Sequence, residues 1–232
     1  EIRSFGGAIK HPKYDPIKTD QYGDDWIMYP VDGYGNKEMV RSFIRQEKPD
    51  ILWFMTDPRF WGWLWEMENE ISPLMPMVYY HVWDNYPYPE FNRKYYESND
   101  CVCTISKVTD DIVRTLSPTL DVVRIPHTVD TETFKNRDEL EYFNLYQNPG
   151  ISPEKTIFFW NNRNARRKQP GSLRFWFKEF LDIVGHDSAS LIMHTEPFDV
   201  HGQNLYKILN KLSLNDGQIL ISTNKMSQED LS

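Results

Sequence analysis

The stretch 161–168 reads NNRNARRK and holds four cations, Arg163, Arg166, Arg167 and Lys168. An apolar run precedes it and an amphipathic run follows it. Arginine forks and a lysine point charge suit phosphate oxygens. The free N–H groups at the start of a helix add to such a site. An anion-binding loop between a strand and a helix is therefore one interpretation of this stretch.

The alternative for this stretch is a solvated charge run. Composition alone favours it, because loops are usually polar and exposed. A nuclear-localisation signal is a weaker interpretation, because the whole chain carries a net charge of −8. The same acidic balance argues against a general nucleic-acid binder, whose footprint would be a basic surface.

The segment 81–88 reads HVWDNYPY and follows an apolar run. Asp84 and Asn85 stand among aromatic rings in an expected loop, which makes this loop a candidate for sugar contact. His81 ends the expected strand, where a lone histidine is more often packed or hydrogen-bonded. The alternating Trp61, Trp63 and Trp65 are better explained by core packing than by stacking on a sugar.

Thr195 and Glu196 follow the apolar run 190–194, so they are candidates to line a cleft. A strand end leading into the turn at Pro197 explains them equally well. No metal site is expected. His194 and His201 lack a completing ligand, and two cysteines alone do not close a zinc site.

Apolar runs and helical spacing alternate along the chain, and this alternation predicts parallel α/β units. Residues 1–24 are expected to form a loop. The expected strands are 25–29, 51–55, 77–82, 102–106, 121–125, 156–160, 190–194 and 218–222. The expected helices are 37–48, 60–71, 91–96, 108–116, 137–146, 172–184, 203–212. The alternation of strands and helices begins again after residue 150, which predicts two Rossmann-like domains. These are an acceptor-side domain, 1–135, and the first part of a donor domain, 151–232. A linker helix is expected within 136–150. Open α/β sheets bind ligands beyond the carboxyl ends of their strands.

Several motifs resemble those of retaining glycosyltransferases of the GT-B fold, family-four type. Arg163-x4-Lys168 directly after a strand resembles the motif that opens the donor domain. The segment 125–134, IPHTVDTETF, resembles the close of the acceptor domain, with Thr128 where the family usually has Gly. Three further segments resemble the family: 48–52 (KPDIL), 79–84 (YYHVWD) and 103–107 (CTISK).

The resemblance implies a two-domain GT-B enzyme that moves a sugar from a nucleotide diphosphate-sugar, with UDP or GDP, to a glycan or other hydroxyl acceptor. Configuration would be retained, without a metal or other cofactor. Arg163 and Lys168 would grip the diphosphate, with Arg167 in a supporting role, and His81 would face the acceptor. The resemblance also makes His127 and Asp130 cleft candidates; Asp130 is alternatively a cap, as is Ser106.

Two expected features of the family are not evident: a first strand with a glycine loop before residue 25, and a Glu-rich segment, which would follow residue 232. We therefore expect the chain to be a piece of a longer protein and to be too short for activity on its own. Two alternatives stay open. One is a non-catalytic GT-B-like carbohydrate-binding or assembly module. The other is a different Rossmann-type nucleotide-sugar enzyme, which is disfavoured because no full glycine fingerprint occurs.

The only cysteines, Cys101 and Cys103, alternate within an expected strand and are expected to be buried free thiols. Such thiols are typical of a reducing compartment, so a cytoplasmic location is expected. No run reaches the roughly 20 apolar residues of a membrane span. Peripheral contact with a membrane is left open.

Overall fold

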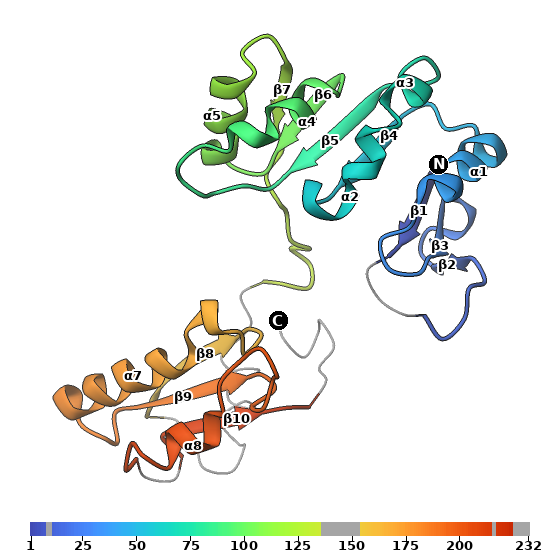
Figure 1. Ribbon diagram of the computed structural model, residues 1–232. Helices are drawn as coiled ribbons and strands as arrows, with labels where there is room; N and C mark the ends of the chain where they lie inside the picture. The colour runs from blue at the N-terminus through green and yellow to red at the C-terminus, as the bar shows by residue number, and fades with distance from the viewer. Residues whose placement is uncertain (8–10, 136–153, 215–216, 225–232) are drawn as a thin grey trace. The chain divides into compact units, whose positions relative to one another are not determined.

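A computed structural model describes residues 1–7, 11–135, 154–214 and 217–224 of the chain (Figure 1). The chain divides into two compact units, Glu1–Thr128 and Val129–Ser232, which we call unit 1 and unit 2. The helix predicted within the linker 136–150 lies outside the described residues.

The strands of unit 1 are β1 (Ile2–Gly6), β2 (Ile17–Lys18), β3 (Trp26–Pro30), β4 (Leu52–Met55), β5 (Met77–His81), β6 (Cys101–Thr104) and β7 (Asp121–Arg124). They form two sheets, with the orders β1-β3-β2 and β4-β5-β6-β7. Every pairing is parallel except the short one between β2 and β3. The parallel α/β arrangement predicted from the alternating pattern is confirmed.

The helices of unit 1 are α1 (Lys37–Glu47), α2 (Pro58–Trp65), α3 (Glu68–Ile71), α4 (Arg93–Glu97) and α5 (Lys107–Leu116), with 3-10 turns η1 (Gly23–Asp25) and η2 (Glu90–Asn92). The prediction of one helix over 60–71 is wrong, because two separate helices, α2 and α3, lie there. The predicted cap at Ser106 is confirmed, since its hydroxyl accepts a hydrogen bond from the Thr109 N–H at 3.2 Å.

The prediction of a loop over residues 1–24 is wrong, because β1 and β2 lie there. β1 has only two large apolar residues, so its local pattern is weak. The strand is held instead by tertiary contacts: it pairs with β3 along its whole length, and the ring of Phe5 packs 4.6 Å from that of Phe43 in α1. Gly6 ends the strand and Gly7 follows it, so a first strand with glycines at its carboxyl end is present.

The core of unit 1 lies between the four-stranded sheet and its helices. Phe54, Tyr79 and Val102 point to one face of neighbouring strands and are buried against Ile112 of α5. The predicted core role of the alternating tryptophans is confirmed for Trp65, which is buried. The rings of Trp61 and Trp63 are partly buried and pack against the same core.

Helix α1 contacts both sheets. Val40 belongs to the core of the four-stranded sheet, whereas Phe43 packs against β1 and β3. At its end, the Glu47 carboxylate accepts hydrogen bonds from Arg3 at 3.2 Å and from the Tyr29 hydroxyl at 2.7 Å. This helix therefore ties the amino-terminal sheet to the rest of unit 1.

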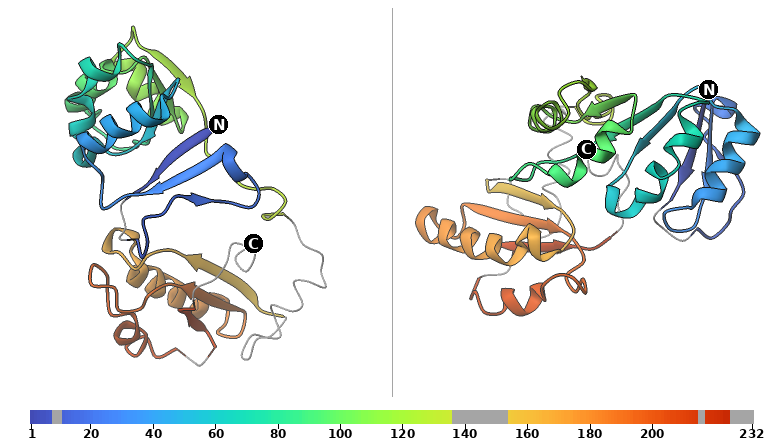
Figure 2. Two further views of the ribbon diagram at one scale, coloured as in Figure 1. Left: turned by 90° about the vertical axis from the view of Figure 1, so that its right-hand side faces the viewer. Right: turned by 45° about the horizontal axis from the view of Figure 1, so that its top comes forward.

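Unit 2 contains β8 (Thr156–Asn161), η3 (Arg166–Lys168), α7 (Pro170–Val184), β9 (Ala189–His194), α8 (Leu205–Leu209) and β10 (Ile219–Ser222). The three strands form a parallel sheet in the order β10-β9-β8. Figures 1 and 2 show α7 lying along one face of it. Phe177 and Leu181 of α7 are buried against Leu191 and Met193 of β9. The carboxyl ends of β8 and β9 therefore lie at one edge, as the sequence predicted.

Candidate functional site

The cation-rich loop lies where the sequence placed it, between the carboxyl end of β8 and the start of α7. Arg163, Arg166 and Arg167 are exposed, and Lys168 is half-buried. Within the part of the chain that the structure describes, only Arg163 among these four forms an ion pair. Three cations on one short segment thus stand without a carboxylate partner.

Arg163 is held by Asp199, which follows β9. The Nε and Nη2 groups of the arginine donate to the two carboxylate oxygens at 2.7 and 3.2 Å. The guanidinium lowers the pKa of Asp199, an effect that the His201 N–H, 2.8 Å from Oδ1, reinforces. The arginine is thereby oriented, but an incoming anion must compete with this carboxylate. Asp199 was not a candidate from the sequence, where its signal is a carboxylate in the loop after the neighbouring strand.

Asn164 fastens this loop to the loop after β9. Its buried amide nitrogen donates to the carbonyl oxygens of Glu196 at 3.1 Å and of Gln203 at 2.7 Å. Its amide oxygen accepts from the Gln203 N–H at 3.1 Å. A Cβ on Gly202 would lie 2.0 Å from the Asn164 carbonyl oxygen, so only glycine fits there. Neither Asn164 nor Gly202 was a candidate, because nothing in the local sequence shows that they meet.

The start of α7 is already partly capped. The side-chain oxygen of Gln203 accepts a hydrogen bond from the Gly171 N–H at 2.9 Å. Pro170, at the first position of the helix, has no N–H to offer. Anion binding in this loop must therefore rest on the side-chain cations more than on the helix terminus.

Thr195 and Glu196 lie at the carboxyl end of β9, as predicted. Thr195 is buried, and its hydroxyl has no hydrogen-bond partner among the described residues. The Glu196 carboxylate is exposed and accepts from the Phe198 N–H at 3.0 Å. The two residues are thus at the carboxyl edge of the sheet, and the Glu196 carboxylate helps to shape its own turn.

His81 is buried at the end of β5, with 1% of its surface exposed. Its Nδ1 lies 2.8 Å from the Tyr79 hydroxyl, and its Nε2 lies 2.8 Å from the Tyr96 hydroxyl. Since Tyr79 donates its proton to the Thr56 carbonyl, Nδ1 carries the imidazole proton and Nε2 accepts from Tyr96. Burial lowers the pKa of His81 to about 4, so the ring is neutral near pH 7. No ring nitrogen is left for an acceptor hydroxyl in this structure, and the packed alternative describes the residue.

The other candidates of unit 1 are exposed. The side chains of Asp84 and Asn85 make no hydrogen bond with any described residue. The ring of His127 stacks on Tyr80 with centroids 5.5 Å apart, and its Nδ1 lies 3.0 Å from the Tyr80 hydroxyl. Thr128, where the family has Gly, keeps φ outside the left-handed region.

Asp130 lies in unit 2, where its side chain caps the turn that follows it. Its carboxylate accepts from the Glu132 N–H at 3.0 Å and from the Thr133 hydroxyl at 2.6 Å. These hydrogen bonds lower its pKa. The alternative interpretation of Asp130 is confirmed.

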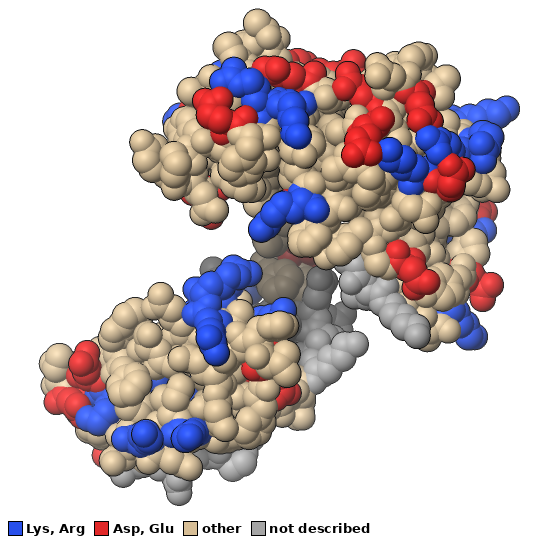
Figure 3. Space-filling view, in the orientation of Figure 1, with Lys and Arg blue, Asp and Glu red and all other residues tan. Residues whose placement is uncertain are grey.

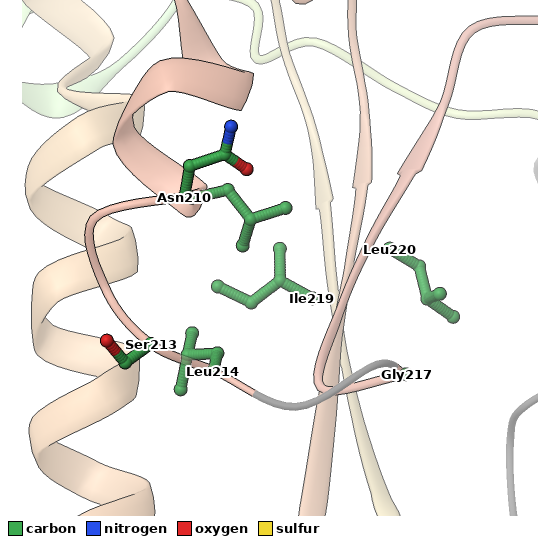
Figure 4. Close-up of a pocket in the computed structure, with 7 residues that line it drawn as sticks. Asn210, Ser213, Leu214, Gly217, Ile219 and Leu220 are labelled. Atoms are coloured by element: carbon green, nitrogen blue, oxygen red, sulfur yellow. The ribbon is translucent and has the colours of Figure 1, made fainter.

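Among the described residues, no three His, Cys, Asp or Glu side chains gather where they could hold a metal ion. No helix in the described ranges has the length and apolar character to cross a membrane. A hollow of about 370 Å³ lies at the amino end of β10, with Leu214 and Ile219 among its lining (Figure 4). That is the opposite edge of the sheet from the cationic loop, and no charged side chain lines it.

No protein-family model matches the sequence, and no curated protein matches it significantly. Solved structures do match. The α,α-trehalose 6-phosphate synthase of Burkholderia multivorans is 11% identical, with a TM-score of 0.61 over 99% of this chain and 67% of its own. Anabaena Alr3699/HepE in complex with UDP and glucose is 11% identical, with a TM-score of 0.62 over 84% of this chain and 55% of its own.

A third match is the E. coli trehalose-6-phosphate structure bound with UDP-2-fluoro glucose, at 8% identity and a TM-score of 0.60. It covers 99% of this chain and 68% of its own. This chain thus spans between about half and two thirds of the length of these structures. At such identities the likeness shows the fold: the chain has the α/β architecture of part of a GT-B structure, with Rossmann-like units. The predicted fold class is confirmed.

Proposed function

We propose that this chain forms part of a glycosyltransferase that moves a sugar from a nucleotide diphosphate-sugar to an acceptor hydroxyl. The observation that carries the proposal is the position of the Arg163-x4-Lys168 spacing. It lies on a GT-B fold, at the carboxyl edge of a parallel sheet and directly before α7. UDP is favoured over GDP as the nucleotide, because two of the similar structures are described with UDP or a UDP-sugar.

In this proposal the cations of the loop stabilise the diphosphate as it leaves. The bond between the anomeric carbon and the phosphate oxygen breaks, and the acceptor oxygen bonds to that carbon and passes its proton to the departing diphosphate oxygen. Negative charge builds on the diphosphate, and Lys168 and Arg163, supported by Arg167, lie in one loop to meet it. One well-placed donor group of this kind lowers barriers by about 3–4 kcal/mol in other enzymes. Side-chain cations would serve in place of a divalent metal. We extend the proposal to retention of configuration on the strength of the sequence motifs.

The acceptor contacts are proposed among the exposed groups of unit 1. Asp84, Asn85 and His127 offer free hydrogen-bonding atoms, whereas both nitrogens of His81 are occupied. We therefore assign His81 a positioning role, through the tyrosine hydroxyls that fix the end of β5. Thr195 and Glu196 are proposed to face the donor side, at the edge of the sheet of unit 2.

The test is calorimetric titration of the chain with UDP and with GDP. Arg163→Ala and Lys168→Ala should each weaken UDP binding by about tenfold, since each removes a charge-assisted contact. Lys178→Ala is the matched control, because Lys178 is paired with Asp182 further along α7. Unchanged UDP and GDP affinity in both loop variants would show that the diphosphate assignment is wrong.

One alternative function has an observation in its favour. Arg163 is engaged by Asp199, and His81 by two tyrosines, which suits a GT-B-like module that binds carbohydrate or assembles without catalysis. The two functions differ in turnover. With the intact protein and a UDP-sugar, release of UDP that depends on an added acceptor supports the transferase. Binding without any release of UDP supports the module.

A further inference from the structure

A second cationic feature lies in unit 2, outside the proposed diphosphate clamp of Arg163 and Lys168. A hollow of about 580 Å³ opens between η3, α7 and α8. Three cations line it: Arg166 of η3, Lys207 of α8 and Lys211 just after α8. Figure 3 shows Lys and Arg side chains over α8 as well as near the start of α7. No carboxylate belongs to the lining, and neither Arg163 nor Lys168 takes part in it.

The charges of this hollow are not balanced within the part of the chain that the structure describes. None of the three cations forms an ion pair with a described carboxylate, although the chain as a whole carries a net charge of −8. Like charges around one concavity repel one another, so an anion that enters relieves a cost already present in the free protein. The hollow is therefore a positively charged site on a protein whose net charge is negative.

The uncharged polar groups of the hollow are arranged as donors too. The side-chain oxygen of Asn204 accepts from the Lys207 N–H at 2.9 Å, and that of Gln203 accepts from the Gly171 N–H. Each amide oxygen is thus committed to a backbone donor, and the two NH₂ groups are left without a partner among the described residues. These NH₂ groups add hydrogen-bond donors to the cations at the hollow, which suits a ligand that offers acceptors.

A buried arginine precedes the wall residue Phe175 in α7. Arg174 of α7 is fully buried next to Phe175, which forms part of the wall. Its guanidinium contacts only neutral atoms: Nε lies 3.1 Å from the Met193 sulfur, Nη1 donates to the Leu205 carbonyl, and Nη2 has no partner among the described residues. A buried charge without a counter-ion is costly, so α7 carries positive charge that no described carboxylate offsets.

The size of the hollow points to a small molecule. Its volume lies within the range of roughly 300–1,000 Å³ found for small-molecule sites. The ring of Phe175, about half exposed, offers an aromatic surface beside the cations. We propose that this hollow is a second anion-binding site, separate from the loop clamp, which takes a small molecule bearing two or more phosphate groups. The site does not depend on the proposed transferase activity.

The test uses inorganic tripolyphosphate as the probe, titrated calorimetrically into the full chain at low salt. The double variant Lys207→Gln/Lys211→Gln should weaken tripolyphosphate binding by tenfold or more, and Arg166→Gln should weaken it several-fold. The control Lys155→Gln/Lys178→Gln removes the same charge from unit 2 outside the hollow and should change the affinity by less than twofold. All these lysines lie at the surface or in surface ion pairs, so the variants are expected to fold.

Titration with UDP separates this site from the proposed clamp. Lys207→Gln/Lys211→Gln should leave UDP affinity unchanged, whereas Arg163→Ala and Lys168→Ala should lower it. Equal loss of tripolyphosphate binding in the hollow and control variants would overturn the proposal in favour of general charge attraction, and no loss in either would also overturn it. Binding to vesicles in which about a fifth of the lipid is anionic is a further measurement. Vesicle binding that needs Lys207 and Lys211, without tripolyphosphate binding, would mean a membrane surface and not a small-molecule site.

Discussion

The guanidinium of Arg163 makes a two-pronged contact with the carboxylate of Asp199, across the two loops that follow β8 and β9. Arg163 is largely exposed, whereas the Asp199 side chain is 13% exposed. The carboxylate thus occupies the donors that a diphosphate would use. At the same time it holds the arginine at the carboxyl edge of the sheet. In the proposed clamp the carboxylate would therefore both orient the arginine and compete with the ligand.

The competition predicts the effect of Asp199→Asn. The variant removes a negative charge beside the proposed clamp and releases Arg163, so UDP binding should tighten by about three- to tenfold, or about 1 kcal/mol. Stability should fall by less than about 1 kcal/mol, because ion pairs with an exposed partner contribute little. Calorimetry with UDP and urea unfolding measure the two effects. Weaker UDP binding in Asp199→Asn would mean that orientation of Arg163 outweighs competition.

A second prediction concerns the pH dependence of stability. Burial lowers the folded-state pKa of His81 to about 4, below the roughly 6.5 of an unfolded histidine. The unfolded state then binds more protons between these two values, so stability is full above about pH 6.5 and falls as the pH drops toward 4. The loss is on the order of 3 kcal/mol at most. Urea unfolding at a series of pH values from 7 to 4 measures it.

The control for this pH dependence is a pair of histidine variants. His81→Gln should be less stable at pH 7 and should lose much of the decline between pH 6.5 and 4. His127→Gln changes an exposed ring on Tyr80 and should keep the decline of the parent chain. A decline of the same size in His81→Gln would place its origin in the carboxylates instead.

The tyrosines around His81 give a third, graded prediction. Tyr79→Phe removes the hydroxyl that bonds to both His81 Nδ1 and the Thr56 carbonyl, leaving one buried and one part-buried group unsatisfied. Tyr96→Phe removes only the partner of Nε2 among these contacts. We expect losses of about 2–3 kcal/mol for Tyr79→Phe and about 1–2 kcal/mol for Tyr96→Phe in unfolding free energy. The reverse order would contradict the assigned imidazole proton.

Features that depend on neighbouring residues in the chain were predictable from the sequence, whereas those that depend on tertiary contacts were not. Ser106 was identifiable as a cap, because its signal lies within one turn of chain. The strand–loop–helix context of Arg163 and Lys168 was identifiable from apolar periodicity. β1 was missed because pairing with β3 and packing against Phe43 hold it, and the sequence of residues 2–6 alone does not indicate either contact.

In the candidate site, too, the features that were missed depend on residues far apart in the sequence. His81 was located correctly at a strand end, but its burial depends on Tyr96, 15 residues away. Asp199 and Gln203 meet the cationic loop from 36 and 39 residues away. Such contacts arise from the packing of two neighbouring strands. Spacing within one segment cannot indicate them, whereas it does indicate caps and amphipathic faces.

The contact between Gly202 and Asn164 supports the last prediction. In Gly202→Ala the new methyl group would lie 2.0 Å from the Asn164 carbonyl oxygen, a backbone atom that cannot move aside without shifting its loop. We expect a loss of about 2–4 kcal/mol in the unfolding free energy of unit 2, together with weaker UDP binding because the loop carries Arg163 and Lys168. Gly62→Ala is the matched control. Its methyl group would meet only the Tyr95 hydroxyl, at 3.8 Å, and alanine favours the helix α2 by up to about 1 kcal/mol. A stable Gly202→Ala protein with unchanged UDP binding would show that the two loops move independently.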